Sequence, residues 1–422
     1  MNGISLNYTD AGIPVATERI KGTVSSGFMV AVRTGSRDES KEKGGISHLL
    51  EHMVFRGTKN RTSLQISKEI EGAGGEMNAF TGKEMTAFYG MTLNNTADVA
   101  KELVADICVS PLLSEKDTEL EKKIVLQEIS MWENDPDSYI HKLFAETIWN
   151  GHELSQNEAG EIDVVSSLTY KDLREYFDER YRHPNIAVMA AGDVDVNDVT
   201  EWAETAFGGT AAGTKIKRRP PVREGSAYRF YPRKDDHTYT GMGFHAYQAD
   251  HPDMPALKLL TALLGAGMSS RLFQKIREEN ALVYSVFTAI DQNSDAGSMA
   301  AYMSSTSGNA MNAISAAAGV LKELKEGGLQ KGELERARNL LKGAMARRLE
   351  STGQCLYRMT KMFMLTGKAE PFANDLNALD KVTDEDIMRV AGDIISSKKL
   401  NIAIYGNRTK ELSKLTTDQF DL

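Results

Sequence analysis

Two parts of this sequence, 214 residues apart, carry the same local pattern. Thr169 and Thr383 each begin a segment typical of a helix with a threonine cap. A short apolar strand follows in both places and ends at a glycine, Gly192 in the first half and Gly406 in the second. The separation is 214 residues for the threonines (169 to 383) and for the glycines (192 to 406). A constant offset of about half the length of a 422-residue chain indicates duplication, so we predict two domains of like fold.

A segment typical of a linker lies between the two repeats. Residues 208–213 consist mainly of glycine and alanine, and residues 215–221 read Lys-Ile-Lys-Arg-Arg-Pro-Pro. We therefore predict a first domain at 1–212, a linker at 213–226 and a second domain at 227–422. We interpret the basic run as a solvated linker, because the formal net charge of −9 argues against general affinity for nucleic acid.

The predicted strands come in groups and do not alternate with helices. In the first half they cover 4–9, 13–18, 23–33, 77–81 and 86–91, and helical patterns follow at 97–108, 117–133 and 139–149. The second half has strands near 228–231 and 238–244, a helix from 254, strands at 282–291 and 298–303, and then long helices. Groups of strands with groups of helices predict an α+β fold, with two tandem homologous domains. Each is a mostly antiparallel sheet covered by helices on one face.

Cysteine usage and hydropathy bear on the environment of the protein. Only two cysteines occur, Cys108 and Cys355, which excludes a disulfide framework and favours a reducing compartment. The N-terminal residues have neither the cationic start nor the apolar segment of a signal peptide. The apolar run at 27–32 is far too short to span a membrane. We therefore expect a cytoplasmic protein whose partners include neither membrane nor nucleic acid.

The strongest functional signal is the segment His48-Leu49-Leu50-Glu51-His52. On a helix, His48, Glu51 and His52 fall on one face and apolar residues fall on the other. Two imidazoles one turn apart, with a carboxylate between them, are what zinc ligation from a helix requires, together with a base near the metal-bound water. The alternative is a solvated polar face, and it is disfavoured because chance pairing is rare in a chain with 8 histidines.

A site with two histidines needs a third protein ligand and leaves a fourth position for water. The helix predicted at 117–133 offers Glu128, and Glu121 lies in line with it seven residues earlier. Both are placed on the apolar stripe of that helix, which we assign to Ile124, Val125, Met131 and Trp132. Carboxylates on a buried face are costly unless a cation or hydrogen-bond donors receive them. The alternative is an amphipathic helix whose two glutamates snorkel or form ion pairs.

The order of these residues resembles that of a known family of metallopeptidases. His-x-x-Glu-His is the inverted zincin motif, and Glu128 follows it after seventy-five further residues, with Glu121 seven before. This pattern resembles the pitrilysin family, which includes insulin-degrading enzyme and the mitochondrial processing peptidase, and in particular its small two-domain prokaryotic members. The resemblance implies one Zn²⁺ per chain bound by His48, His52 and Glu128, with Glu51 as general base and Glu121 as a supporting acid.

Two further segments of the first half fit the resemblance. Asn78-Ala79-Phe80-Thr81 corresponds to the edge strand of the family, onto which a substrate peptide adds as an extra strand. Taken alone, the segment is simply a strand. Glu84 fits the family pattern in a structural role.

The second half has no His-x-x-Glu-His segment, but Arg277 and Tyr284 resemble the Arg-x6-Tyr pair of the family. Ala281 or Val283 stands where the family usually has glycine. By the resemblance, Arg277 and Tyr284 stabilise the oxyanion together with zinc, and a two-fold homodimer lets each subunit complete the active site of the other. Taken alone, Arg277 is more typical of a solvated helix cation.

The sequence thus predicts a zinc metalloendopeptidase that cleaves unfolded peptides or short polypeptides. One alternative is a non-catalytic or weakly active subunit of a peptide-binding or processing assembly. Another is a zinc hydrolase that acts on non-peptide amides. Because the chain keeps both the histidine motif and the Arg/Tyr pair, an active homo-oligomer is favoured.

Overall fold

A computed structural model describes residues 3–222 and 225–422, which form two compact units. Residues 1–2 of the predicted first domain and 223–224 of the predicted linker lie outside the described part. The first unit consists of three segments: the N-terminal part of the chain up to Ser130, Gln156–Arg219 and Ala346–Phe372. The second unit contains Met131–Ser155, Pro220–Met345 and Ala373–Leu422. Each half of the sequence therefore gives one segment to the unit formed mainly by the other half.

The first unit is built on a six-stranded sheet. In spatial order its strands are β1 (Gly3–Tyr8), β2 (Pro14–Arg19), β6 (Ile186–Gly192), β3 (Ser25–Val32), β5 (Thr86–Leu93) and β4 (Glu76–Thr81). All neighbours are antiparallel except β2 and β6. The central strands β3 and β6 are almost wholly buried, which accounts for their continuous apolar sequence, whereas β4 lies at the edge.

The second unit repeats this topology with one strand fewer. In spatial order its strands are β7 (Ala227–Pro232), β11 (Leu400–Gly406), β8 (His237–Ala246), β10 (Gly297–Thr306) and β9 (Ser285–Gln292). This order matches β2-β6-β3-β5-β4 strand for strand, and the single parallel pair, β7 with β11, stands at the same place. The duplication inferred from the sequence is therefore visible in the sheet topology.

Helices account for the remaining regular structure. In the described part of the first half they are α1 (Ile46–Val54), α2 (Ser63–Gly72), α3 (Ala97–Val109), α4 (Glu115–Asn134), α5 (Pro136–Ile148), α6 (Ile162–Ser167), α7 (Tyr170–Arg180) and α8 (Val196–Phe207). The second half has α9 (Met254–Gly265), a π-helical segment at Phe273–Glu279, α10 (Ala310–Gly327), α11 (Glu333–Arg348), α12 (Thr352–Thr366), α13 (Phe372–Asp380) and α14 (Asp384–Ile394). The repeated threonines cap α7 and α14 with matching hydrogen bonds from the third helical residue.

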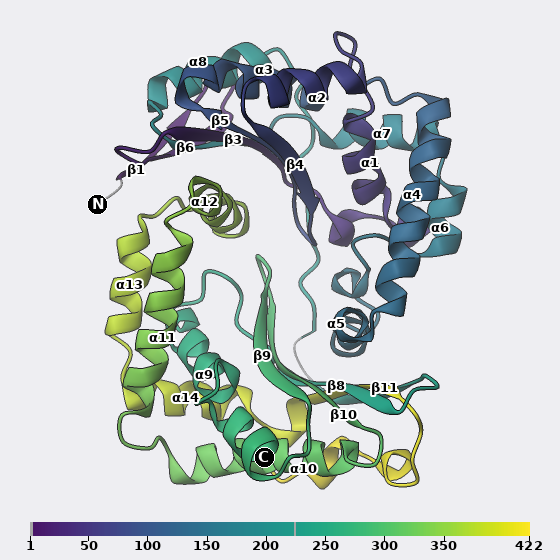
Figure 1. Cartoon of the computed structure of the whole chain (residues 1–422), viewed down its shortest axis with the longest axis vertical. Coiled ribbons are helices and arrows are strands. Elements are labelled where there is room, and N and C mark those ends of the chain that lie inside the picture. The colour runs from purple at the N-terminus through teal and green to yellow at the C-terminus, as the bar shows by residue number, and fades with distance from the viewer. Residues whose placement is uncertain (1–2, 223–224) are drawn as a thin grey trace. The chain divides into compact units, whose positions relative to one another are not determined.

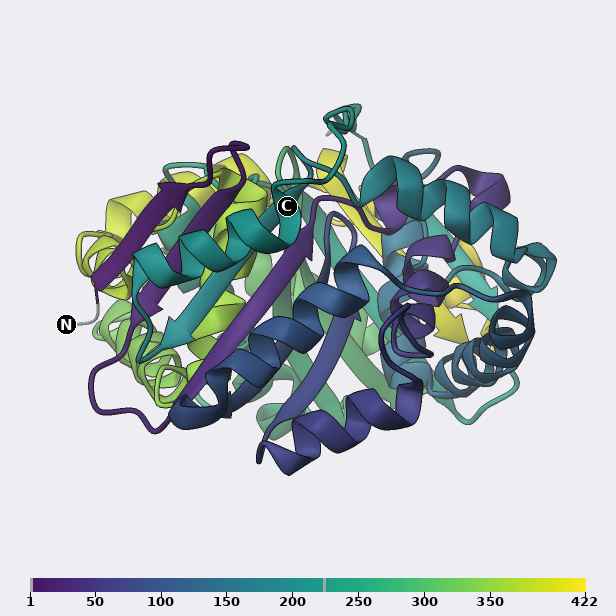
Figure 2. The ribbon, with the colours of Figure 1, turned by 90° about the horizontal axis from the view of Figure 1, so that it is seen from above.

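Helices cover both faces of the first sheet (Figures 1 and 2). Phe28 of β3 packs against Trp202 of α8, and α3 lies beside α8 on that face. The neighbouring residue Gly27 faces α12, because a Cβ atom built on it would lie 3.1 Å from a methyl group of Leu356. Since successive strand residues point to opposite faces, α12 covers the face opposite to α8.

The second sheet is covered in the same way. A Cβ atom on Gly241 of β8 would lie 3.0 Å from Phe144 of α5, whereas Met242 and Phe244 join the main core with Leu264 of α9. The predicted α+β class with two mostly antiparallel sheets is confirmed. The prediction that helices cover only one face of each sheet was wrong. The second face of the first sheet is covered by α12 and that of the second sheet by α5, and each helix lies in one of the two exchanged segments.

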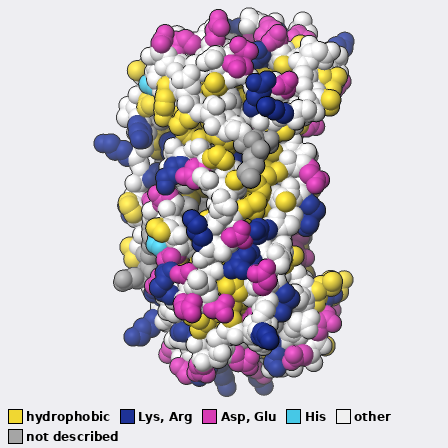
Figure 3. Space-filling model, turned by 90° about the vertical axis from the view of Figure 1, so that its left-hand side faces the viewer, with side chains coloured by type: hydrophobic (Ala, Val, Ile, Leu, Met, Phe, Trp, Pro, Cys, Tyr) yellow, Lys and Arg dark blue, Asp and Glu magenta, His cyan; other side chains and the backbone are white. Residues whose placement is uncertain are grey.

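Surface charge and helix hydropathy both bear on the expectations from the sequence. On the face drawn in Figure 3, Lys and Arg side chains are interspersed with Asp and Glu, and no large area there carries one sign of charge alone. Within residues 3–222 and 225–422, no helix combines the length and apolar character that crossing a bilayer requires.

Candidate metal centre

Helix α1 carries the His-x-x-Glu-His segment and is buried along its apolar face. Leu49, Leu50 and Met53 are fully inaccessible, which anchors the helix to the interior of the first unit. On the other side of the helix, Glu51 and His52 remain half-buried. The helical face predicted from the sequence is therefore the one that carries the polar groups.

The start of α1 is capped from outside the helix. Gly45 precedes the helix with a φ of 89°, and it offers no side chain to cap the free N–H groups. The carboxylate of Glu39 accepts the N–H of Gly45 at 2.7 Å and that of Ser47 at 2.8 Å. Burial raises the pKa of Glu39 to about 8, against the opposing effect of the hydrogen bonds from Ser47 and Gly45. This contact could not be predicted from the sequence, since Glu39 fits no capping pattern for α1.

The structure brings His48, His52 and Glu128 together. Their ligand atoms all lie within 4.8 Å of one another. Glu128 Oε2 lies 3.7 Å from His48 Nε2 and 3.5 Å from His52 Nε2. Ligands about 2.0–2.1 Å from a tetrahedral zinc ion are separated by about 3.3–3.5 Å, so this donor set fits zinc with little adjustment. Two imidazoles and one carboxylate are also the ligand types of catalytic zinc sites.

The two histidines differ in their electrostatic surroundings. Burial, and to a lesser degree the charge of His52, lowers the pKa of His48 to about 4. Burial also lowers the pKa of His52, but its hydrogen bond to Glu121 and the nearby carboxylates of Glu51 and Glu128 raise it more, so the net shift is upward. A metal binds neutral imidazole, and the lowered pKa keeps His48 in that form at neutral pH.

Glu121 contacts His52 on the ring nitrogen that faces away from Glu128. Its Oε2 lies 3.0 Å from Nδ1 of His52, while Nε2 of the same ring faces Glu128. Its Oε1 pairs with Arg56, and the side chain is 5% exposed. Burial raises the pKa of Glu121, but its contacts with His52 and Arg56 lower it to a greater extent. A carboxylate on the outer nitrogen of an imidazole fixes the ring and its tautomer for metal binding.

The apolar stripe assigned to α4 was partly wrong. Ile124 and Met131 are exposed, at 40% and 63%. The buried side of the helix consists of Thr118, Glu121, Lys122, Val125 and Ile129. Glu121 is buried as its place on the stripe predicted, whereas Lys122 was not assigned to the stripe. Lys122 is buried because its ammonium group donates a hydrogen bond to the carbonyl oxygen of Leu168. Glu128 is only partly buried, at 27% side-chain exposure.

Glu51 lies next to the edge strand of the first sheet. Thr81, the last residue of β4, donates a hydrogen bond of 2.5 Å from Oγ1 to Glu51 Oε2. Burial raises the pKa of Glu51, and Glu128 adds to this, although Thr81 and His52 act in the opposite direction. A raised carboxylate pKa suits a group that must take up a proton near neutral pH.

The predicted substrate-binding strand, Asn78–Thr81, forms the second half of β4. β4 pairs with β5 on one side only, so its other edge is the edge of the sheet. Asn78 is exposed, and the ring of Phe80 lies 5.2 Å from that of Tyr357 on α12. Thr81 has a contact that the strand pattern did not indicate, namely the one with Glu51.

Arg277 and Tyr284 belong to the second unit. Arg277 is exposed on the π-helical segment, and its guanidinium lies 4.7 Å from the ring centre of Phe273. Tyr284 precedes β9 with 81% of its surface exposed. Ala281, between them, adopts a left-handed conformation with a φ of 49°. Ala281 is one of the two positions at which the resembled family usually has glycine.

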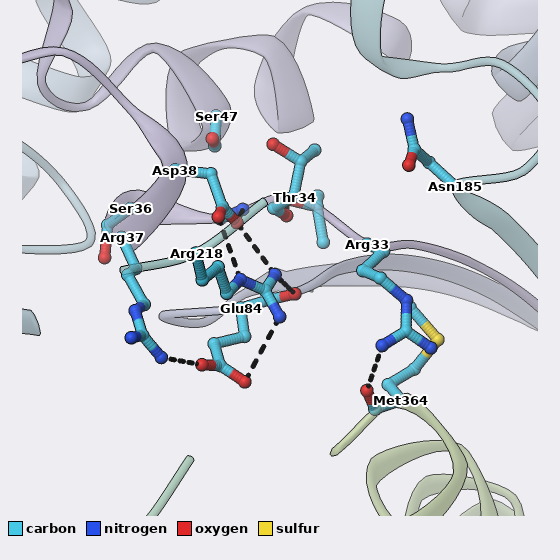
Figure 4. A network of polar contacts seen from close by, with 12 residues as sticks. Arg33, Thr34, Ser36, Arg37, Asp38, Ser47, Glu84, Asn185, Arg218 and Met364 are labelled. Atoms are coloured by element: carbon cyan, nitrogen blue, oxygen red, sulfur yellow. Dashed lines mark hydrogen bonds and ion pairs between the residues drawn. The ribbon is translucent and has the colours of Figure 1, made fainter. Parts of the chain in front are cut away.

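Glu84 takes part in a buried network at the first unit (Figure 4). It pairs with Arg37 and, at 3.3 Å, with Arg218. Arg218 also pairs with Asp38 at 2.9 Å. The side chain of Arg218 is 10% exposed, so this part of the basic run is not solvated as predicted. The carboxylates of Asp38 and Glu84 are each 2% exposed and therefore need a cation as partner. The linker sequence alone does not indicate that Arg218 provides this cation.

Known proteins resemble the chain over almost its whole length. The model of the insulinase family, peptidase family M16, matches residues 14–160, and that of the peptidase M16 inactive domain matches residues 167–341. An uncharacterised zinc protease of Streptomyces coelicolor is 31% identical over 412 residues, which cover 96% of this chain and 90% of the relative. An uncharacterised zinc protease of Bacillus subtilis is 30% identical over 386 residues, covering 90% and 93%.

Solved structures show the same fold. A protease from Helicobacter pylori has a TM-score of 0.88 at 22% identity, with 96% of this chain and 100% of that chain covered. A protein from Pseudomonas fluorescens described as a peptidase M16 inactive domain has a TM-score of 0.89 at 16% identity, covering 96% and 98%. The family model and the names of the relatives support a protease-like family. The chain belongs to the insulinase family, peptidase family M16.

Proposed function

We propose that this protein is a zinc-dependent endopeptidase that cleaves unfolded peptides or short polypeptides. The observation that carries the proposal is the convergence of His48, His52 and Glu128 within 4.8 Å, with Glu51 on the same helix as both histidines. The names of the relatives, uncharacterised zinc proteases, support the choice of metal and reaction class. In this proposal 1–212 is the catalytic domain, 213–226 the linker, and 227–422 a homologous domain without a metal site.

The ligand set assigns a distinct task to each residue. His48, His52 and Glu128 hold the metal, and Glu121 orients the ring of His52 through Nδ1. A zinc ion with three protein ligands supplies Lewis acidity, which polarises a peptide carbonyl and makes water acidic enough to react near neutral pH.

Glu51 is the proposed general base. Thr81 donates to its Oε2, which leaves Oε1 to accept the proton of the attacking water. The same carboxyl group then passes the proton to the leaving amine. Because Glu51 lies three residues after His48 and directly before His52, its position is set by the helix that carries the metal ligands.

The edge strand β4 is the proposed binding site for the substrate backbone. Residues 78–81 end at Thr81, so a peptide added along β4 runs past the residue that holds Glu51. Main-chain hydrogen bonds of this kind need an extended substrate, which favours unfolded peptides over folded proteins.

We further propose that the protein works as a homodimer in the cytoplasm. In this arrangement Arg277 and Tyr284 complete the site of the partner subunit and stabilise the oxyanion. The exposure of both side chains supports a role in contact with another molecule.

Incubation with a peptide library, read by mass spectrometry, tests the function. We expect cleavage by the zinc-loaded wild type, loss of cleavage with a chelator, and recovery on addition of zinc. Glu51→Gln is the matched control. It keeps the metal ligands and loses the base, so it should retain zinc and lose about 10²–10⁴-fold in turnover. Chelator-resistant cleavage, or near-normal cleavage by Glu51→Gln, would contradict the proposal.

A further inference from the structure

The loop after β3 is attached to the turn between β4 and β5. The N–H of Ser36 donates to Gly82 O at 3.1 Å, and the N–H of Arg37 donates to Lys83 O at 2.9 Å. At Gly35 a Cβ atom would collide with the carbonyl oxygen of Gly82, so this close approach requires glycine there. The two loops therefore form a joint structure at one end of the first sheet.

Arg218 bridges these two loops from a distant part of the chain (Figure 4). Its Nε and Nη2 each donate to one carboxylate oxygen of Asp38 at 2.9 Å. Its Nη2 also donates to Glu84 O at 2.8 Å, and its Nη1 lies 3.3 Å from Glu84 Oε2. Asp38 stands in the loop after β3, and Glu84 stands in the turn after β4. A planar guanidinium that contacts both loops fixes their separation.

Each loop leads directly to a contact of the candidate metal centre. The residue after Asp38 is Glu39, whose carboxylate caps α1 through Gly45 and Ser47. On the other side, Thr81 stands three residues before Glu84 and holds Glu51. The position of α1 and that of the end of β4 thus depend on loops that Arg218 joins.

We propose that Arg218 is a positioning residue for the metal centre and the general base. This inference rests on the proposed function. Arg218 lies two residues before Pro220, at which the longest segment of the second unit begins, so the segment that leaves the first unit takes part in holding its proposed active site. Without the guanidinium, the buried carboxylate of Asp38 loses its bidentate partner and Glu84 loses one of its cations, while its pair with Arg37 remains. The two backbone hydrogen bonds and the Arg37–Glu84 pair still join the loops, but the contact that fixes their separation is lost, so both the cap of α1 and the Thr81–Glu51 contact weaken.

The first test is hydrogen exchange of the metal-free full-length protein, which does not depend on activity. We compare Arg218→Gln with Lys217→Gln, a matched loss of charge at the exposed neighbouring position. Arg218→Gln should raise exchange in residues 46–54 and 76–85 by about 10-fold or more, with no change in residues 285–306. Lys217→Gln should behave as the wild type.

The second test is steady-state cleavage of a short peptide together with zinc affinity. Arg218→Gln should lower kcat by about 10–100-fold and weaken zinc binding, while KM stays near the wild-type value, because Arg218 is assigned no contact with substrate. Arg218→Lys keeps the charge but not the fork and should show a smaller effect of the same kind. If Arg218→Gln does not fold, the comparison of Arg218→Lys with Lys217→Gln decides the matter.

Equal exchange and equal kcat in Arg218→Gln and Lys217→Gln would overturn the inference. A rise in KM without a fall in kcat would overturn it as well. A wild type that neither binds zinc nor cleaves peptides would instead refute the proposed function, and the exchange result would still show whether Arg218 holds α1 and β4.

Discussion

Thr81 Oγ1 donates to Glu51 Oε2 across 2.5 Å, which joins the edge strand of the first sheet to the proposed general base. One residue thus stands both at the end of the proposed substrate strand and against the carboxylate that is to take up the proton. Thr81 therefore serves both the proposed binding of the substrate backbone and the proposed proton transfer.

Thr81→Val should impair catalysis most strongly at low pH. The hydrogen bond from Thr81 acts to lower the pKa of Glu51, so its loss raises that pKa and leaves more of the base protonated. The acidic limb of kcat/KM against pH should move to higher pH, with a loss of about 10-fold or more below it, because a hydrogen bond to a charged group contributes about 1.5–3 kcal/mol. Thr81→Ser keeps the hydroxyl and should retain the wild-type profile. An unchanged limb in Thr81→Val would contradict this role.

Glu128→Gln and Glu121→Gln should separate metal binding from support of the metal ligand. Glu128 is the proposed direct ligand, so its amide variant should lose most zinc at low free metal. Glu121 contacts His52 on the outer nitrogen, and its removal should weaken zinc binding by about 10–100-fold. Zinc titration against a competing chelator measures both. Full occupancy in Glu128→Gln would place the third ligand elsewhere.

Glu39 should make the stability of the metal-free protein depend on pH. Burial raises its pKa to about 8 in the folded state, from the ordinary value of 4.5 that holds in the unfolded chain. The folded state therefore holds a proton that the unfolded state has released between these values, so the contribution of Glu39 is present below pH 4.5 and is lost as pH rises to about 8. Urea unfolding of wild type and Glu39→Gln at several pH values checks this. The variant should lose less stability over the window, and parallel curves would show that Glu39 does not titrate there.

Tyr284 should act in the site of the partner subunit. Glu51→Gln and Tyr284→Phe chains, each poorly active alone, should regain part of the activity after subunit exchange, because one site of the mixed dimer combines Glu51 with the partner's Tyr284. Native mass spectrometry verifies the exchange. If mixed dimers form and no activity returns, the pair does not complete the partner's site.

Ala281→Gly should stabilise the protein. Ala281 has a φ of 49°, a left-handed conformation that costs a residue with a Cβ atom about 1–2 kcal/mol. Glycine removes this cost but loses more entropy on folding, so a net gain of about 0.5–1 kcal/mol in the free energy of unfolding is expected. Ala316→Gly, within α10, should destabilise by about the same amount. Chemical denaturation of both variants decides the sign at Ala281.

The features predicted correctly from the sequence are those that follow from the regular spacing of residues within one helix or one strand. The polar face of α1 follows from the spacing of His48, Glu51 and His52, and the strand pattern located β4 to within one residue. Contacts between segments far apart in the chain have no such period. Nothing near Glu39 or Arg218 in sequence indicates that they meet α1 and the β4–β5 turn. The predicted stripe of α4 was partly wrong for the same reason, since the partner that receives the buried Lys122 lies on another segment.

The exchange of α5 and α12 between the two halves has a consequence for synthesis of the chain. Domains commonly fold in the order in which they leave the ribosome. Here β3 and β6 are complete by residue 192, but the helix that covers their second face ends at Thr366. The nascent first half therefore presents an uncovered apolar surface until most of the second half has been translated. A gene truncated at the linker would encode a sheet with one bare face, and an exposed apolar surface of that kind promotes aggregation.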